Sequence, residues 1–350
     1  MAFTSRLPFL PLPVISSVVV AVGASHIKIP QLLASLLSGQ GRYSRAVAAI
    51  LIFANLKNLP FIWHLRVWSA ILRHCYINKP KVPPALATST LFLPVITASR
   101  SPLLECDYNL HKSNSSYFSD LDVTRSHIIC ALLEPGIRKT KNNNTERLVL
   151  TPQGEPVQGR WSVILGATAC NFKREIGIYE PYEMWSRLLC WDRKWLYFVT
   201  HFVKRGTVKP SSYIHTDGSW LRKGYQTRKG EGKDDEDVDE RAIFASAISK
   251  YVVKIGRLTV HPEVILAASN LLPPRPGGWH TMTSPPSAIT SSDAMEFVDV
   301  DGPDCEWRRV EERNKRGLMY AEHFHALEGL NQEFSGSKGP ALGKYADLFR

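Results

Sequence analysis

The first 104 residues of the chain contain no aspartate or glutamate, and Glu105 is the first acidic residue. Ten lysines and arginines lie in this acid-free segment, whereas the formal net charge of the whole 350-residue chain is +11. The excess positive charge therefore belongs to the N-terminal segment, and the rest of the chain is close to neutral. A nucleic-acid-binding protein is expected to carry basic and aromatic residues together on its folded body. This distribution does not supply them, so we predict no nucleic-acid partner.

Several short motifs are also missing. The chain has no Gly-x-Ser-x-Gly sequence, which disfavours a serine hydrolase that uses a nucleophile elbow. It has neither His-Glu-x-x-His nor a P-loop, which would indicate a zinc protease or a nucleotide-binding protein. The cysteines show no Cys-x-x-Cys pair and no metal-ligand spacing with histidine, so we predict no metal and no cofactor. They are scattered as expected of reduced thiols in an intracellular protein, at positions Cys75, Cys106, Cys130, Cys170, Cys190 and Cys305.

No uninterrupted apolar run is long enough to span a bilayer, which takes roughly 20 residues. Prolines interrupt the apolar stretch 7–24, which leaves only Val14–Ala24. A second apolar stretch, 46–53, continues into 61–72, where tryptophan and arginine are interleaved as at a membrane interface. We predict that residues 1–78 form an apolar, basic N-terminal extension that attaches the protein to a membrane surface. A mitochondrial presequence and a helical extension packed on the domain are the alternatives.

Composition divides the remaining chain. Residues 79–87 are proline-rich and predict a linker. Residues 88–271 hold the predicted folded domain, and the charged, glycine-rich stretch 206–241 predicts a disordered insertion within it, because it lacks apolar residues to bury. Residues 272–303 are again rich in proline, glycine, serine and threonine and predict a second linker. Residues 304–350 predict a C-terminal helix, running from Asp304 to about Leu330, and a tail.

Strand-like runs of aromatic and β-branched residues recur through the predicted domain. They cover Thr88–Ser101, Arg160–Ile176, Tyr182–Trp191, Lys194–Lys204 and 242–259. The third and fourth runs are separated by only two residues, Asp192 and Arg193, which predicts a tight antiparallel hairpin. A helical turn is expected at Glu263–Ser269.

The segment from Glu105 to Arg125 combines an acidic strand end, a polar turn and a helix start. Tyr117, Leu121, Ile128 and Leu132 recur at helical spacing, which predicts a central helix. Ser113 or Asn114 is a suitable N-cap for that helix. A carboxylate that faces the free amides of a helix start can attack or hydrate a carbonyl whose oxygen those amides polarise. The segment is therefore the candidate active site.

Asp107, Asn109, His111, Asn114 and Tyr117 resemble the active-site segment of the hot-dog thioesterases of the 4-hydroxybenzoyl-CoA type. That family carries an acid at a strand end and, ten residues on, an aromatic residue in the central helix, which is the separation of Asp107 and Tyr117. Three longer segments are similar to a fungal thioesterase-like branch of the superfamily. They are His111–Asp122, Phe172–Ile176 and Trp195–Phe202, and the likeness covers roughly residues 88–270.

The resemblance implies an α+β hot-dog fold, in which an antiparallel sheet wraps a long central helix, and an acyl-thioester hydrolase. The acyl group would be carried on CoA or on an acyl carrier protein, in lipid or polyketide metabolism. Asp107 would act as nucleophile or general base, with His111 and Asn114 assisting in catalysis and Asn109 and Tyr117 contacting the substrate. The alternative interpretation makes Asp107 and the polar residues ordinary turn and capping groups, with Tyr117 a core residue.

Hot-dog domains, by the same resemblance, pair their sheets into a homodimer or a larger assembly, with the active sites at the interface. We therefore expect at least a dimer. The alternative to an enzyme is a catalytically inactive, membrane-associated hot-dog protein that binds acyl chains or protein partners.

Overall fold

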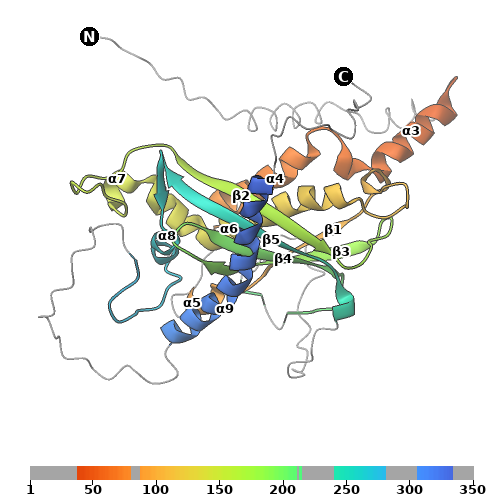
Figure 1. The fold of residues 1–350 in the computed structure, drawn as a ribbon. Helices are drawn as coiled ribbons and strands as arrows, with labels where there is room; N and C mark the ends of the chain where they lie inside the picture. The colour runs from red at the N-terminus through yellow and green to blue at the C-terminus, as the bar shows by residue number, and fades with distance from the viewer. Residues whose placement is uncertain (1–37, 80–86, 211–212, 215–239, 281–305, 334–350) are drawn as a thin grey trace, which may run out of the picture.

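The computed structural model describes residues 38–79, 87–210, 213–214, 240–280 and 306–333. Residues 1–37, which include the predicted apolar stretch 7–24, lie outside these residues. So do most of the predicted linker 79–87, most of the predicted insertion 206–241, most of the predicted linker 272–303 and the tail after residue 333. The described part contains one antiparallel sheet with helices on both of its faces (Figure 1).

The sheet has six strands, in the order β1-β3-β4-β5-β2, and β6 pairs with β5. All of the pairings are antiparallel. β1 and β2 are thus the edge strands of the main path. The strands are β1 (Val95–Arg100), β2 (Trp161–Phe172), β3 (Pro181–Trp191), β4 (Leu196–Lys204), β5 (Ile243–Ile255) and β6 (Leu258–Val260).

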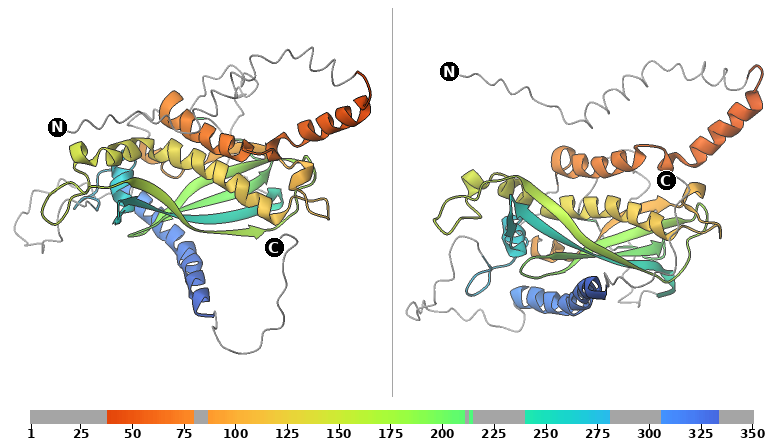
Figure 2. Two further views of the ribbon diagram at one scale, coloured as in Figure 1. Left: turned by 90° about the horizontal axis from the view of Figure 1, so that it is seen from above. Right: turned by 45° about the horizontal axis from the view of Figure 1, so that its top comes forward.

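The central helix is α6, which runs for 28 residues from Asn114 to Lys141. Its apolar residues recur three to four positions apart, so that one stripe faces the sheet. Tyr117 and Leu121 belong to one core cluster with β3, β4 and β5, whereas Ile128 and Leu133 belong to the larger core cluster towards the other end. Figure 2 shows α6 along one face of the sheet. This is the hot-dog arrangement, and the α+β prediction is confirmed.

Shorter helices surround this unit, and α9 lies across the opposite face of the sheet from α6 (Figure 2). The described helices besides α6 are α3 (Arg42–Ala54), η1 (Leu56–Asn58), α4 (Ile62–Leu72), η2 (Arg73–Ile77), α5 (Ala87–Thr90), η4 (Leu103–Glu105), α7 (Asn143–Glu146), η6 (Glu240–Ala242), α8 (Pro262–Ala268), α9 (Glu306–Ala326) and η7 (Leu327–Glu333).

The far end of α6 is fixed by close packing against α8. A Cβ atom added to Gly136 would lie 2.4 Å from both the Ile265 carbonyl oxygen and the Ser269 hydroxyl oxygen. Pro135, inside the helix, cannot donate a backbone hydrogen bond, and the next amide, that of Gly136, donates instead to Ser269 Oγ at 3.0 Å. Glycine therefore allows α8 to approach the backbone of α6 and hold it against the sheet.

The predicted first strand needs correction at its start. Within Thr88–Ser101 only Val95–Arg100 is extended, and Ala87–Thr90 forms the short helix α5. The hairpin of β3 and β4 and the helical turn now called α8 agree with the predictions. The predicted boundary at 271 falls inside packed structure, because Leu272 and Trp279 pack against the main core.

The N-terminal segment combines two different environments. α4 lies against α6, and Ala70 of α4 is buried. α3, in contrast, projects from the body, and none of its residues is buried (Figure 1). No helix in the described part of the chain is both long and apolar enough to cross a membrane.

Candidate active site

Asp107 begins a tight loop that returns the chain to the start of α6. Its amide donates to the His111 carbonyl at 2.9 Å, and the Leu110 amide donates to the Asp107 carbonyl at 3.0 Å. Cys106 and Lys112 close the base of the loop as an antiparallel bridge. Leu110 has a φ of 63°, the left-handed conformation that such a tight reversal requires. The backbone therefore fixes the position of Asp107 at one end of the sheet.

The Asp107 side chain is half-buried and only partly engaged. Its Oδ1 accepts the Asn109 amide at 2.9 Å, which makes an Asx turn. Among the described residues, its Oδ2 has no hydrogen bond and no ion pair. One carboxylate oxygen is thus held in place while the other remains open to a ligand or a water molecule.

The other predicted polar residues lie around this loop in different orientations. His111 Nε2 is 3.1 Å from Glu175 Oε2, in an exposed contact. Asn109 is exposed at the tip of the loop, and Asn114 is the exposed first residue of α6. The structure therefore brings these residues to the same loop and helix start, but it directs the His111 ring towards Glu175.

Tyr117 lies beneath this surface, in the core. Its ring centroid is 5.0 Å from that of Phe172 and 4.9 Å from that of Phe202. The Lys112 ammonium lies over the ring, 5.3 Å from its centroid. Burial raises the pKa of the Tyr117 phenol well above its ordinary value, so the hydroxyl stays protonated.

The start of α6 presents backbone amides. Ser113 is the N-cap residue, but its side chain makes no capping bond and instead contacts Ser115 Oγ at 2.9 Å. The Ser113 amide donates to the Glu105 carbonyl at 2.8 Å. The first amides of a helix have no acceptor within the helix, and they carry the positive end of its dipole. This end of α6 can therefore polarise a carbonyl oxygen.

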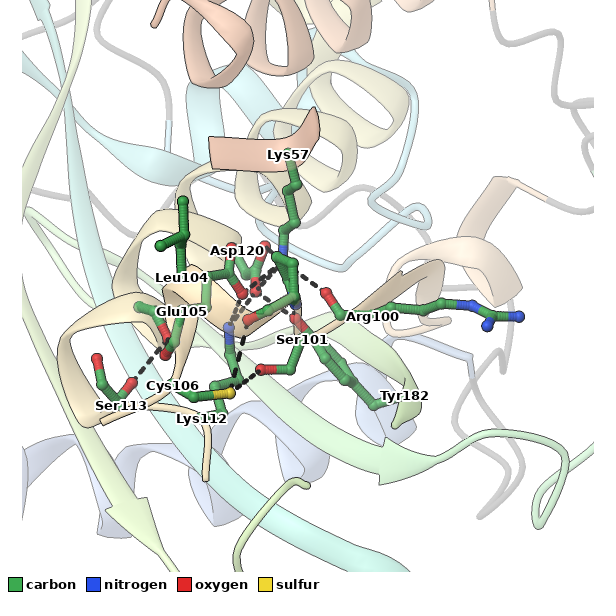
Figure 3. Close-up of polar contacts among 12 residues, drawn as sticks. Lys57, Arg100, Ser101, Leu104, Glu105, Cys106, Lys112, Ser113, Asp120 and Tyr182 are labelled. Carbon is green, nitrogen blue, oxygen red and sulfur yellow. Dashed lines mark hydrogen bonds and ion pairs between the residues drawn. The ribbon is translucent and has the colours of Figure 1, made fainter. Parts of the chain in front are cut away.

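A network of buried charges lies directly under the loop, and the sequence analysis did not predict it. Its members come from the N-terminal segment, the loop, α6 and β3 (Figure 3). We call it the buried ion cluster, and it consists of Lys57, Arg66, Glu105, Lys112, Asp120 and Tyr182.

Asp120 is the centre of the buried ion cluster and has no exposed surface. Its carboxylate is 2.9 Å from Lys57 Nζ, 2.7 Å from Arg66 Nη2 and 2.9 Å from Lys112 Nζ. The Tyr182 hydroxyl also donates to it. Burial alone would raise the pKa of this carboxyl, but the three cations and the Tyr182 hydroxyl hold it well below its usual range. Asp120 is therefore ionised and fully paired.

Glu105 connects the cluster to the loop. Its Oε2 accepts from Lys112 Nζ at 2.6 Å and from Lys57 Nζ at 2.9 Å. Its backbone carbonyl holds the Ser113 amide, as described above. Burial lowers the pKa of Lys57, and the attraction of Asp120 and Glu105 opposes that shift. The cluster thus fixes both ends of the loop that carries Asp107.

The N-terminal segment completes this arrangement through its backbone and side chains. Lys57 Nζ donates to the Arg100 carbonyl at 3.1 Å, at the end of β1. Asn55 Oδ1 accepts the Leu104 amide at 2.9 Å. The Tyr179 hydroxyl donates to the Ala54 carbonyl at 3.1 Å. Residues 54–66 are consequently part of the folded domain and not a separate extension.

The sequence contained a signal for this cluster. Asp120 lies three positions after Tyr117 and one before Leu121, on the apolar stripe of α6. An acid on a stripe that must be buried needs opposite charges beside it. Lys57, in the middle of an acid-free apolar segment, is such a charge, but nothing in the sequence shows that the two meet.

A cleft of about 400 Å³ opens beside the start of α6. Its walls come from the N-terminal segment, from Leu104 and Glu105, and from four serines of the helix start, namely Ser113, Ser115, Ser116 and Ser119. A second hollow, of about 490 Å³, lies at the opposite end of β3 between Lys194 and His261. The predicted site residues Asp107, Asn109, His111, Asn114 and Tyr117 line neither of the two. The described residues include no group of three or more side chains that could hold a metal ion.

Comparison with known proteins identifies the family. A family model described as the thioesterase-like superfamily matches residues 102–229, which include the loop and α6. The thioesterase poxG of Penicillium oxalicum is 36% identical over 306 residues, covering 86% of this chain and 90% of that protein. The chain belongs to the thioesterase-like superfamily.

Two further relatives of this thioesterase-like protein are also named as thioesterases. The probable thioesterase atnL of Emericella nidulans is 32% identical over 325 residues, covering 89% of this chain and 93% of that protein. The thioesterase lcsJ of Purpureocillium lilacinum is 32% identical over 303 residues, covering 78% and 86%. The predicted membership of a thioesterase family is confirmed, and the family and the names of these relatives support an acyl-thioester hydrolase in general terms.

Proposed function

We propose that the protein hydrolyses acyl thioesters with the Asp107 carboxylate as its reactive group. One observation supports this more than any other. Asp107 is held by its backbone loop and by a single amide, and its second oxygen is open. Of the other carboxylates near the helix start, Glu105 and Asp120 are buried and occupied by cations, Asp122 pairs with Arg125, and the exposed Glu175 contacts His111. Asp107 is therefore the carboxylate of the loop itself that is available for chemistry.

Two reaction routes fit this geometry. As a nucleophile, the Asp107 carboxylate would attack the thioester carbonyl carbon, the carbon–sulfur bond would break, and the thiolate would leave and take up a proton. Water would then hydrolyse the mixed anhydride and regenerate the carboxylate. As a general base, Asp107 would instead accept a proton from the water molecule that attacks the same carbon. In both routes the amides at the start of α6 stabilise the oxyanion.

The neighbouring polar residues have supporting roles in this proposal. His111, oriented by Glu175, protonates the leaving thiolate or relays a proton. Asn109 follows Asp107 in the loop and Asn114 begins α6, and the exposed amides of both could hydrogen-bond the thioester. Tyr117 forms part of the apolar floor below them.

We infer an acyl thioester of CoA or of an acyl carrier protein as the substrate, in lipid or polyketide metabolism. The cleft beside the α6 start is lined by Ser113 and Ser115, which flank Asn114, and not by Asp107, and it has the size of a small-molecule pocket, which ranges from about 300 to 1,000 Å³. The relatives named above, from three fungi, are thioesterases or a probable thioesterase.

We also infer that the active unit is a homodimer that pairs through β2. This strand is twelve residues long, lies at the edge of the sheet, and exposes Ile164, Leu165 and Phe172. A long apolar edge strand is normally covered by another chain. In sedimentation, the parent should be a dimer and Ile164→Arg should shift it towards the monomer. A parent that sediments as an active monomer would contradict the inference.

The test of the proposed function is a thiol-release assay with the full-length protein and acyl-CoA substrates from C2 to C18, together with a phosphopantetheine thioester. Turnover should appear for at least one acyl length, and His111→Ala should lower kcat less than the loss of Asp107 does. Binding of acyl-CoA without turnover at any length would instead indicate an inactive acyl-binding protein and would overturn the proposal.

A further inference from the structure

The second half of helix α3 is apolar around its whole circumference, and no residue of the helix is buried, although the Tyr179 hydroxyl donates to the carbonyl of its last residue, Ala54. Successive helical residues are about 100° apart, so four consecutive residues point in all directions. Ile50, Leu51, Ile52 and Phe53 are consecutive and are 65%, 53%, 49% and 69% exposed. An ordinary surface helix would bury one side of such a sequence. α3 therefore requires an apolar environment outside the fold.

The exposed apolar surface continues beyond α3 onto the outer side of α4. Leu65 and Trp68 are exposed on the side of α4 opposite the buried Ala70, whereas Trp63, seven positions before Ala70, shares its side and lines the cleft beside the start of α6. Phe61, in the turn before α4, is also exposed. Tryptophan is enriched where a protein meets the interface between lipid and water, because its ring is apolar and its N–H is polar.

The charge of this surface has one sign. The described residues 38–79 contain no acid, and of their six lysines and arginines Lys57 and Arg66 are paired in the buried ion cluster. Arg42 donates to the Tyr43 hydroxyl, and Arg45 donates to backbone carbonyls, so within the described structure neither forms an ion pair. A surface that combines apolar side chains with unopposed positive charge is complementary to an anionic bilayer.

We propose that α3 and the outer side of α4 form a docking surface that inserts into the interface of an anionic membrane. The docking surface consists of the exposed apolar residues of these helices together with Arg42 and Arg45. A second copy of this chain would be a poorer occupant, because its own docking surface would bring like charges together. An anionic lipid surface satisfies both the apolar and the basic side chains.

The position of this surface relative to the catalytic domain is fixed at η1, between the two helices. Lys57 and Asn55 are bound to the domain through Glu105, Asp120 and the Leu104 amide. The docking surface is thus a face of the folded protein, on the side of α6 that faces away from the sheet (Figure 2). α9 lies on the opposite side and provides matched control positions.

The first experiment measures the partition of full-length protein onto phosphatidylcholine vesicles with and without about one-third phosphatidylserine. Arg42→Gln combined with Arg45→Gln should weaken partition onto the anionic vesicles about 30-fold, since each basic residue near such a surface contributes about 1 kcal/mol. Lys315→Gln with Arg316→Gln, on α9, should change it by about twofold or less. Equal partition of the Arg42/Arg45 variant and the parent would overturn the proposal.

A second experiment tests the apolar part with Ile50→Ser and Phe53→Ser together. Vesicle binding should fall roughly tenfold or more, because both side chains leave water on insertion. The control is Met319→Ser with Tyr320→Ser, which are equally exposed on α9 and should leave binding unchanged. Circular dichroism should be the same for all variants, since α3 buries no residue. A variant that dissociates an oligomer without losing vesicle binding would show a contact between copies and would contradict the membrane assignment.

Discussion

Glu105 and Asp107 are separated only by Cys106, yet their carboxylates have different neighbours. Glu105 is buried and accepts from two lysines, and it shares them with Asp120. Asp107 is half-buried and accepts one backbone amide. The charges around Glu105 are all paired, whereas one oxygen of the Asp107 carboxylate has no partner among the described residues. Two acids in one short segment are thus suited to different tasks, one to holding the loop and the other to reacting with a substrate.

The difference arises from where the cations come from. Lys112 belongs to the loop itself, but Lys57 and Arg66 belong to the N-terminal segment, and they reach Asp120 from outside the sheet-and-helix unit. Three cations against two carboxylates leave the buried ion cluster with no unpaired acid. The support of the loop that carries Asp107 therefore depends on residues about fifty positions earlier in the chain.

The largest expected effect on stability comes from Asp120→Asn. This change removes the carboxylate that three cations share and leaves their charges buried with one acid. Breaking a buried ion pair from one side typically costs about 3–5 kcal/mol. The free energy of unfolding should be measured by urea denaturation. Should Asp120→Asn unfold like the parent, the buried ion cluster would not support the fold.

Lys57→Met should have a smaller effect, about 1–3 kcal/mol, since Lys112 and Arg66 still neutralise the carboxylates and the methionine retains an apolar stem. The matched control is Lys79→Met, at an exposed lysine of the same N-terminal segment, which should change the free energy of unfolding by less than about 0.5 kcal/mol. Equal effects of the two changes would mean that the N-terminal segment does not hold the cluster.

The dependence of stability on pH tests whether Asp120 is ionised and paired with cations in the folded protein. The folded protein lowers the pKa of Asp120, whereas aspartates of the unfolded chain titrate near about 3.9. The folded state therefore binds a proton at Asp120 less readily than the unfolded state does. The stability contributed by Asp120 is therefore present above the unfolded pKa and is lost as the pH falls. Between about pH 5 and 3 the urea midpoint of the parent should fall more steeply than that of Asp120→Asn, and parallel curves would contradict the assignment.

Much of the fold could be predicted because its signals are local. The alternation along Tyr182–Trp191 and Lys194–Lys204 and the two residues between them gave β3 and β4, and the spacing of Tyr117 and Leu121 gave α6. The first strand was predicted too long, since β-branched and apolar residues at 88–94 also suit the short helix α5. The local sequence alone does not decide between a strand and a helix at residues 88–94, because the choice depends on how the segment packs against the rest of the fold.

Part of the candidate site could be predicted, because that part depends on neighbouring residues in the sequence. Asp107 and the start of α6 are consecutive in sequence, so the loop could be predicted from its residues. The ion pair between Lys57 and Asp120 joins residues 63 positions apart, and no local pattern specifies such a contact. The acid-free N-terminal segment indicated a membrane surface, but it gave no indication that Lys57 is bound inside the domain.

The most direct test of the account is kcat/KM of Asp107→Asn on the best acyl thioester, measured beside its free energy of unfolding. The substitution keeps the shape of the side chain and the acceptor for Asn109 but removes the charge. We expect kcat/KM to fall by ~10²-fold to ~10⁴-fold, with the free energy of unfolding within about 1 kcal/mol of the parent. An Asp107→Asn protein that turns over like the parent would contradict the central claim that this acid performs the chemistry.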